Sequence, residues 1–396
     1  MITHFHIENF KSLADFDLPP EGTELAGFTC LVGMNGAGKT TLLQAFDFTA
    51  RLMTGRVKDW FAMRGWSPWD VRTRYGAQEG GNIKLAVELR LPDGRQARWE
   101  AEWDWETMRC AREKISFLGG ESLLKFSSEG SMWIATDDTH GEEFPKIPFS
   151  FEGSVLSSLQ LEGYHPALTA VKNTLQGLHS LELLSPHLIR RSSQQSDDIG
   201  VGGEQLTGFL SQLSTEQWDD LTAKIRSIYP QVESLRTQPK QFGWKGLLVK
   251  ESGMGGNEVT EAHINDGFLR VLAMLSQAYT PHGILLLDEI ENGINPAVAE
   301  KLMDFLVSLS RQDRQVIVTT HSPVILNYLE DDVAREGVIL LFKTADGRTH
   351  SRRYFDIPEN GQKLRSLGPG EVFLDTSIEA LVDRLSVEES QGSFAS

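Results

Sequence analysis

Cysteine is scarce in this chain: Cys30 and Cys110 are the only two among 396 residues. So few thiols exclude a disulfide framework or a cysteine-rich zinc site, and they fit a reducing compartment. Apolar runs as long as a membrane span are also missing, and the first residues, MITHFH, do not have the pattern of a signal peptide. We therefore expect a cytoplasmic protein that has no membrane partner.

Basic residues are also fewer than acidic ones. The chain has 38 Lys and Arg against 55 Asp and Glu, which gives a net charge of -17. Such a surface repels nucleic acid and anionic membranes, so contact with DNA would need a local basic patch or a partner protein. The length allows a large core, arranged as two or three domains or as one domain with insertions.

Heptad repeats are the third absence. Apolar residues at helical spacing predict helices over 154–161, 166–183, 204–213 and 215–229, but no heptad pattern persists among them. Long coiled-coil arms are therefore excluded. Between these helices, residues 192–203 are polar and rich in glycine, and we expect them to be mobile.

A phosphate-binding loop is the clearest feature that the chain does contain. Residues 33–40, GMNGAGKT, match the P-loop pattern G-x-x-x-x-G-K-[ST] at every fixed position. A buried strand is predicted before the loop, over 28–32, and a helix after it, so the helix N-terminus would face the phosphates. The backbone N–H groups would cradle the β-phosphate, Lys39 would reach the β- and γ-phosphates, and Thr40 would ligate Mg²⁺. The residues expected to hold the nucleotide are Gly33, Asn35, Gly36, Gly38, Lys39, Thr40 and Thr41.

Two further apolar strands end in residues that suit phosphate chemistry. The run over 284–287 is hydrophobic throughout, as in a parallel strand buried on both faces, and it ends in Asp288 and Glu289. Asp288 could hold the Mg²⁺ shell, and Glu289 could polarise the attacking water. A second strand over 316–320 leads to His321, whose imidazole could hydrogen-bond the γ-phosphate and sense its loss.

Together these segments resemble the Walker A, Walker B and switch-histidine motifs of an ABC-type ATPase head of the SMC/RecF/OLD-like branch. The run DEIENGINP, over 288–296, is similar to the D-E-P-E-N-G-L-H-P run of that branch, and INDGFLR, over 264–270, is similar to its L-S-D-G-T-x-R signature. In that architecture the signature of one head covers the ATP of another, so the resemblance implies Mg²⁺ and ATP as cofactors and a homodimer, or a higher oligomer, closed by ATP. The signature contacts would come from Asn265, Asp266 and Gly267. Asn265 replaces the family's serine, so slow hydrolysis is expected.

Three more candidates come from the same resemblance. Residues 2–18 alternate like an edge strand and contain the turn Asn9–Ser12, similar to an N-F-K-S-like motif whose Lys and Ser lie beside the nucleotide. Lys11 and Ser12 are therefore candidates, with a charged surface turn as the alternative. Gln160 is the candidate for the glutamine in the loop that joins the two lobes, and thus for a metal contact.

Seven of the nine tryptophans lie between residues 60 and 133. Alternating strands over 83–91 and 97–105, joined by a turn at 92–94, predict a β-meander with an aromatic face. Such a face could stack on bases. However, the opposite positions carry Glu100, Glu102 and Asp104, which oppose phosphate, so we favour core packing.

After His321, residues 327–396 are too few for the TOPRIM nuclease domain of OLD proteins, and Asp331 and Asp332 lack its metal-binding frame. A strand is expected over 338–342 with a return over 352–355, and a hairpin over 246–249 and 259–262. From Val387 onward we expect disorder.

The predicted fold is an α/β P-loop NTPase of ABC type, in which a mixed core sheet is joined by an antiparallel β lobe and a helical insertion. Lobe I would span 1–150, the helical insertion 151–235, lobe II 236–345 and a C-terminal extension 346–396. The resemblance implies an ATPase subunit that senses infection or DNA and controls a separate effector, such as a nuclease, as in the anti-phage systems Septu and PARIS. The alternatives are an ATP-dependent scaffold with negligible turnover and a RecF-like DNA-repair ATPase. A transporter ATPase is disfavoured, because its signature reads L-S-G-G-Q and it needs a membrane partner.

Overall fold

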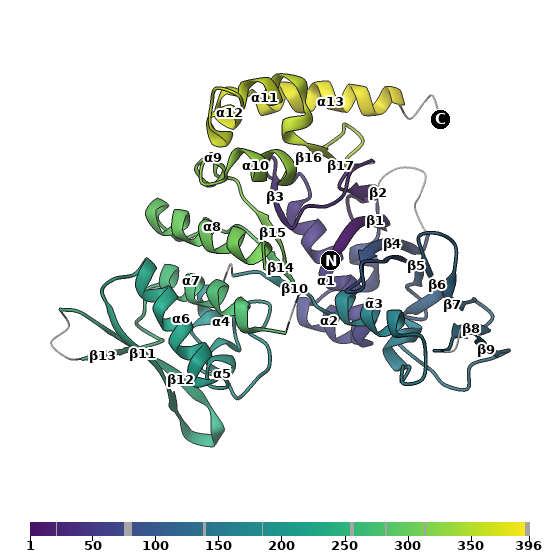
Figure 1. Cartoon of the computed structure of the whole chain (residues 1–396), viewed down its shortest axis with the longest axis horizontal. Coiled ribbons are helices and arrows are strands. Elements are labelled where there is room, and N and C mark those ends of the chain that lie inside the picture. The colour runs from purple at the N-terminus through teal and green to yellow at the C-terminus, as the bar shows by residue number, and fades with distance from the viewer. Residues whose placement is uncertain are drawn as a thin grey trace.

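The computed structural model describes residues 1–20, 22–74, 81–137, 140–183, 185–253, 257–281, 283–312 and 314–392. The described residues form two large sheets and one small sheet, with helices packed between and around them (Figure 1). This is the α/β architecture expected from the sequence, with a mixed core sheet and an antiparallel lobe. None of the helices in the described part combines the length and apolarity needed to cross a membrane.

The mixed sheet is the core of the molecule. Its strand order is β10-β14-β15-β3-β16-β17, in which the first five strands run parallel and β17 is antiparallel to β16. The strands are β3 (Phe28–Val32), β10 (Leu178–Leu181), β14 (Ile284–Leu287), β15 (Gln315–Thr319), β16 (Val338–Lys343) and β17 (Thr349–Arg353).

The second sheet is antiparallel and forms the other large layer. Its order is β2-β1-β4-β5-β6-β7-β8-β9. The strands are β1 (Ile2–Phe10), β2 (Leu13–Leu18), β4 (Ile83–Arg90), β5 (Gln96–Asp104), β6 (Arg109–Phe117), β7 (Ser122–Phe126), β8 (Met132–Ala135) and β9 (Gly141–Phe144).

The P-loop helix α1 (Lys39–Thr54) lies between the two large sheets. Its Phe46 ring packs 4.3 Å from Phe5 of β1, and its Phe48 ring packs 5.1 Å from Trp103 of β5, both between ring centroids. Alternate residues of β3 face opposite sides, so Leu31 joins the core around α1 while Cys30 joins the core on the other side. Burial on both faces explains the unbroken hydrophobic runs of these parallel strands.

The part of the fold around the small sheet of β11 (Val232–Pro239), β12 (Lys245–Glu251) and β13 (Glu258–Thr260) appears at the lower left of Figure 1 and is called lobe II from here on. In this usage it includes the helices within residues 186–228, which the sequence prediction assigned to a separate helical insertion over 151–235. The strands β12 and β13 match the expected hairpin, although residues 254–256 of its turn lie outside the described part. Its helices are α4 (Pro186–Ile189), α5 (Leu206–Leu210), α6 (Thr215–Ile228), α7 (Asp266–Ser276) and α8 (Pro296–Ser310), with short turns η4 (Gln241–Gly243) and η5 (Gln277–Tyr279).

The remaining helices flank lobe I or cover the C-terminal strands. Near lobe I lie α2 (Val57–Arg64), η1 (Pro68–Val71), η3 (Val155–Ser158) and α3 (Pro166–Gln176). The C-terminal layer holds α9 (Pro323–Leu326), α10 (Asp331–Gly337), η6 (Tyr354–Asp356), α11 (Pro358–Lys363), α12 (Pro369–Asp375) and α13 (Ile378–Gly392).

The tryptophan-rich stretch packs as core. Trp60, Trp99 and Trp103 are fully buried, and Trp99 donates its ring N–H to the buried Glu113 at 2.8 Å. Trp69 is the exception, since 56% of it is exposed. The aromatic face is therefore mainly the inner surface of the antiparallel sheet, as its acidic neighbours indicated.

Several expected elements were wrong. β1 is not an edge strand, because β2 and β4 pair with it on either side. Only a short 3₁₀ turn, η3, forms within 154–161, and only α5 forms within 204–213. The helix expected over 166–183 ends at Gln176, and β10 follows it as a parallel neighbour of β14. Four residues cannot reveal such a pairing by their own periodicity, since the partner strand lies about a hundred positions away.

Two expectations of mobility also differ from the structure. Within 192–203, Ile199 is fully buried in the lobe II core, and Ser193 forms a bridge to Lys245. At the C-terminus, α13 continues past Val387 to Gly392, and residues 393–396 of the predicted disordered tail lie outside the described part. Leu381 and Leu385 of this helix are buried in the core, so its first half packs on the rest of the molecule. Its C-terminal half is polar and does not show this apolar face in the sequence.

Candidate nucleotide site

The strand order brings the three motifs to one edge of the mixed sheet. β3, β14 and β15 are parallel, with Leu287 of β14 opposite Val318 of β15 and Leu31 of β3 opposite Thr319. Their carboxyl ends therefore coincide, and the segments that follow them lie side by side. In open parallel sheets this edge is where ligands bind.

The P-loop glycines are required by close contacts. A Cβ on Gly33 would lie 2.2 Å from the carbonyl oxygen of Leu341, and Gly33 has a φ of 147°. A Cβ on Gly38, at φ 109°, would lie 2.6 Å from Oγ1 of Thr349. Because Gly38 supplies no side-chain cap to α1, the first N–H groups of that helix remain available to an anion.

Lys39 lies folded back on the loop. Its Nζ donates to the carbonyl oxygens of Gly33 at 2.8 Å and Met34 at 3.1 Å, and it lies 3.3 Å from Nδ1 of His321. Burial lowers the pKa of Lys39 to about 8, although Asp288 and the neighbouring glutamates oppose the shift. The ammonium group is thus held in place by neutral acceptors, which phosphate oxygens could replace.

Thr40 and Asp288 form the candidate Mg²⁺ site. Oγ1 of Thr40 donates to Oδ2 of Asp288 at 2.9 Å, and Oγ1 of Thr319 donates to Oδ1 at 2.5 Å. A hydroxyl and a carboxylate side by side are the hard oxygen ligands that Mg²⁺ prefers, so the donor set fits that ion. The sequence analysis did not identify Thr319 as a site residue, because it is one of two consecutive threonines before His321 and nothing local distinguishes them.

Glu289 and His321 face each other across this edge. Nε2 of His321 lies 3.7 Å from Oε1 of Glu289, and the backbone N–H of His321 donates to Oε1 of Glu291 at 2.6 Å. Glu289 adopts a left-handed φ of 48°, which costs free energy in a residue with a side chain. Its N–H donates to Oγ1 of Thr319, which helps to hold that conformation.

The signature segment lies on lobe II and begins α7. Oδ1 of Asn265 accepts from the backbone N–H of Phe268 at 3.3 Å and so caps the helix, and Asp266 forms an ion pair with Arg190 at 2.6 Å. A Cβ on Gly267 would lie 2.4 Å from the carbonyl oxygen of Gly293, in the segment that follows Glu289. Asn265 itself is exposed.

Arg270 links the same two segments, and sequence reasoning missed it. Its guanidinium is buried and donates to the carbonyl oxygen of Asn292 at 2.9 Å. The start of α7 is therefore attached within one chain to the loop that carries Glu289. The sequence did offer a signal for this residue, because Arg270 is the final arginine of the signature-like segment over 264–270.

The turn between β1 and β2 lies beside the P-loop. Oγ1 of Thr349 is 2.8 Å from Oγ of Ser12 and 3.0 Å from the carbonyl oxygen of Ala37. Lys11 points the other way, with its Nζ donating to Gln44 at 2.8 Å and lying 3.6 Å from the ring centroid of Trp66. Ser12 therefore adjoins the loop backbone, while Lys11 lies along α1.

Gln160 is not placed at this edge. It is exposed and follows η3, whose N-cap Ser154 is bonded to Leu52 near the C-terminal end of α1. At a rise of 1.5 Å per residue, that end lies about 18 Å along the helix from Thr40. The prediction that Gln160 contacts the metal was wrong.

Glu182 lies at this edge of the sheet instead. It follows β10, and the pairing of Leu181 with Leu287 sets Glu182 alongside Asp288. Its carboxylate lies 2.9 Å from Arg64, which also contacts the fully buried Asp47 at 3.1 Å. Burial raises the pKa of Glu182, although Arg64 opposes the shift. Recognising β10 as a strand would have identified this residue.

Comparison with known proteins finds matches to ATPase families and to a named nuclease. Residues 132–327 match an AAA domain family whose description names the AbiEii toxin and a type IV TA system, and residues 1–58 match an AAA ATPase domain family. A protein named OLD nuclease, from Thermus scotoductus, is 24% identical over 369 residues, which span 88% of this chain and 63% of that protein. The chain thus spans less than two thirds of that relative.

One solved structure supports the same fold. An Smc head domain with an extended coiled coil, bound to the C-terminal domain of ScpA and derived from Pyrococcus furiosus, matches with a TM-score of 0.51 at 15% identity, over 92% of this chain and 99% of that one. An SmcHead bound to the C-winged helix domain of ScpA matches with a TM-score of 0.48 at 17% identity, over 89% and 96% of the two chains.

Proposed function

We propose that this chain, an ABC-type ATPase head of the SMC/RecF/OLD-like branch, binds Mg-ATP, hydrolyses it and pairs with a second copy when ATP is bound. One observation supports this proposal above all. The ends of β3, β14 and β15 bring Lys39, Asp288, Glu289 and His321 together at one edge of the sheet.

We assign each residue a role on the basis of its position. Lys39 would exchange the carbonyls of Gly33 and Met34 for phosphate oxygens, and the first N–H groups of α1 would bind the β-phosphate. Glu289 would orient the attacking water, and His321, which adjoins both Lys39 and Glu289, would contact the γ-phosphate. Mg²⁺, held through Thr40 and Asp288, would supply charge neutralisation at the β- and γ-phosphates.

Pairing of two heads would complete the site. Asn265 is exposed at the start of α7 and could approach a phosphate of the facing chain. Its Oδ1 caps the helix, which leaves the amide nitrogen as the donor. Since α7 is attached to the Glu289 loop through Arg270, contact in trans would be sensed where hydrolysis occurs.

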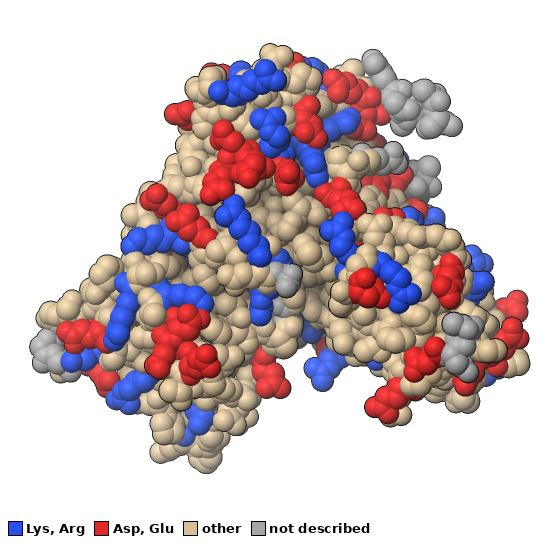
Figure 2. Space-filling view, in the orientation of Figure 1, with Lys and Arg blue, Asp and Glu red and all other residues tan. Residues whose placement is uncertain are grey.

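The biological output we propose is control of a separate effector, such as a nuclease, in anti-phage defence. This part rests on the resemblance of the motifs and on the OLD nuclease relative, and not on the geometry of the site. Direct DNA binding is less favoured. On the face drawn in Figure 2, blue and red side chains alternate over the described residues and do not join into a broad basic surface, and the net charge is -17.

The test is the Glu289→Gln variant. We expect its steady-state ATP turnover to fall by about 100-fold or more, because the group that orients water is lost while Mg-ATP binding is retained. Its mass by light scattering should double with Mg-ATP. The matched control is Glu300→Gln, which removes the same charge from the exposed face of α8 and should behave as wild type.

Two outcomes would oppose the proposal. Equal turnover in wild type and Glu289→Gln would favour a scaffold that binds ATP and uses little of it. If the measured mass equals that of one chain both with and without Mg-ATP, the proposal that two heads pair on ATP is wrong.

A further inference from the structure

A second cluster of metal-ligating side chains lies on the ribbon of β1 and β2, on the outer face of the antiparallel sheet. Side chains alternate along a strand, so Phe5 and Ile7 enter the core while His4 and His6 point outward. Asp15 and Asp17 share the outward face of β2 for the same reason. A His-x-His pair therefore lies opposite an Asp-x-Asp pair, with His6 directly across from Asp17.

The ligand atoms of these residues converge. Oδ1 of Asp17 lies 3.2 Å from Nε2 of His4 and 3.0 Å from Nδ1 of His6. The other ring nitrogen of His6 lies 3.9 Å from Asp15 and 3.6 Å from Glu8. One ligand atom from each of His6, Asp15 and Asp17 can be chosen so that all three lie within 4.8 Å of one another.

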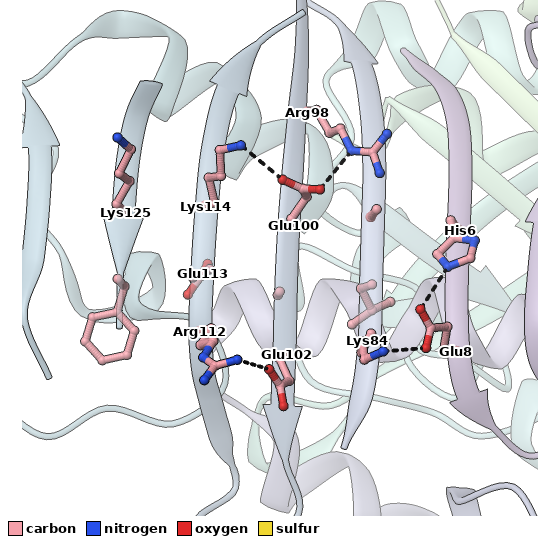
Figure 3. A pocket seen from close by; sticks show the side chains of 14 residues that line it. His6, Glu8, Lys84, Arg98, Glu100, Glu102, Arg112, Glu113, Lys114 and Lys125 are labelled. Atoms are coloured by element: carbon pink, nitrogen blue, oxygen red, sulfur yellow. Dashed lines mark hydrogen bonds and ion pairs between the residues drawn. The ribbon is translucent and has the colours of Figure 1, made fainter. Parts of the chain in front are cut away.

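The surroundings favour a cation. Three carboxylates, from Glu8, Asp15 and Asp17, surround His6, and Lys84 on β4 forms a 2.7 Å ion pair with Glu8. Figure 3 shows His6 and Glu8 pointing toward each other on β1, with Lys84 on the far side of Glu8. Among the ion pairs formed by the described residues, Asp15 and Asp17 therefore contact imidazoles and no lysine or arginine, although Lys84 also interacts electrostatically with Asp15 at longer range.

We propose that this ribbon binds one divalent transition-metal ion of the zinc class, with His6, Asp15 and Asp17 as ligands. Imidazole together with carboxylate suits Zn²⁺ better than Mg²⁺, which prefers oxygen alone. Bonds of about 2.0–2.2 Å require the ligand atoms to move inward by about 1 Å. Asp15, whose side chain is 63% exposed, is free to make that rotation, and the paired strands hold the other ligands in register.

Binding here would act on the nucleotide site through the same ribbon. The ribbon turns at Lys11 and Ser12, and Ser12 is bonded through Thr349 to the Ala37 carbonyl of the P-loop. An ion that ties β1 to β2 would stiffen that turn. Because only the folded ribbon brings these ligands together, metal loading should also raise the thermal stability of the chain, by mass action on the folded state.

The experiment is a titration of chelator-stripped, nucleotide-free protein with Zn²⁺ against a chromophoric chelator, in millimolar Mg²⁺ to occupy oxygen-only sites. Wild type should bind one Zn²⁺ per chain. His6→Asn and Asp17→Asn should each weaken binding by about tenfold or more, and Asp15→Asn, at the most exposed ligand, should do so without risk to folding. His187→Asn, which changes an exposed histidine of lobe II, should bind as wild type.

A further variant locates the ion. Glu289 and His321 could also hold zinc, so His321→Asn must keep its zinc if the ribbon is the site. Visible absorption of the Co²⁺-loaded protein gives a second readout, and it should be lost in His6→Asn and kept in His321→Asn. Absence of binding in wild type, or equal affinity in wild type, His6→Asn and Asp15→Asn, would overturn the proposal. Because no ATP is used, either result leaves the ATPase proposal to its own test.

Discussion

At the scale of single residues, the site consists of groups whose neighbours define what they can do. Asp288 is held by two threonine hydroxyls, one from the P-loop helix and one from the neighbouring strand. Such fixed orientation keeps a carboxylate ready for a cation without rearrangement. Lys39 is the opposite case, because its ammonium group is bonded to neutral carbonyls that can release it.

Lys39 gives a prediction about protons. Burial lowers the pKa of Lys39 to about 8 in the nucleotide-free protein, so the side chain loses its charge as the pH rises through that value. Phosphates favour the charged form, so ATP binding above pH 8 should take up about one proton and weaken as the pH rises further. At pH 7 there should be almost no uptake. Calorimetry in buffers of different ionisation enthalpy measures this directly.

The control for that measurement is Lys39→Arg. Arginine stays charged throughout this range, so any binding that this variant retains should occur without proton uptake at pH 8 to 9. Equal uptake in both proteins would show that another group takes up the proton.

At the scale of elements, α7 and the loop after β14 form one unit. Gly267 packs against the carbonyl of Gly293, and Arg270 donates to Asn292, so the start of the helix and the Glu289 loop touch at two points. These two contacts join the signature segment to the loop that carries Glu289. A phosphate bound by the signature could therefore influence the position of the hydrolytic residues through them.

Gly267→Ala tests this packing without ATP. The added Cβ would lie 2.4 Å from a backbone oxygen, a contact that forces the helix and the loop apart. We expect the free energy of unfolding of the nucleotide-free protein to fall by about 2 kcal/mol. Gly283→Ala, whose Cβ would meet open space, should change it by less than about 0.5 kcal/mol. Urea unfolding compares the two, and equal midpoints would contradict the contact.

At the scale of the whole molecule, α1 is the centre of lobe I, and the antiparallel and mixed sheets enclose it on both sides. The P-loop at its N-terminus and the signature on α7 belong to different parts of the fold. We propose that a complete site uses both, with the signature supplied by a second chain related to the first by two-fold symmetry.

Mixing two inactive proteins tests that arrangement. Lys39→Ala removes the P-loop lysine and Asn265→Ala removes the signature side chain, so each protein alone should be nearly inactive. A mixed dimer would hold one intact P-loop facing one intact signature. With random pairing, turnover should return to about a quarter of the wild-type value. No recovery on mixing, with both variants shown to associate, would place the signature and the P-loop contact in the same chain.

The sequence by itself determined the nucleotide motifs and the class of fold. The P-loop, the Asp288–Glu289 pair and His321 each lie at the end of an apolar strand, and each motif is a short run of residues, so its chemistry can be recognised locally. Core packing of Trp60, Trp99 and Trp103 was also predictable, because the acidic residues at intervening positions argued against a phosphate-binding face.

The tertiary structure alone decided the rest, since those features depend on contacts between distant residues. β10 is a strand because β14 pairs with it, and this pairing makes Glu182, and not Gln160, the neighbour of Asp288. The shifted pKa of Lys39 comes from burial, and the partners of Thr319 and Gly267 come from other elements of the sheet and loops. Local periodicity carries no record of which segment lies opposite, and packing, hydrogen bonding and desolvation are all set by that neighbour.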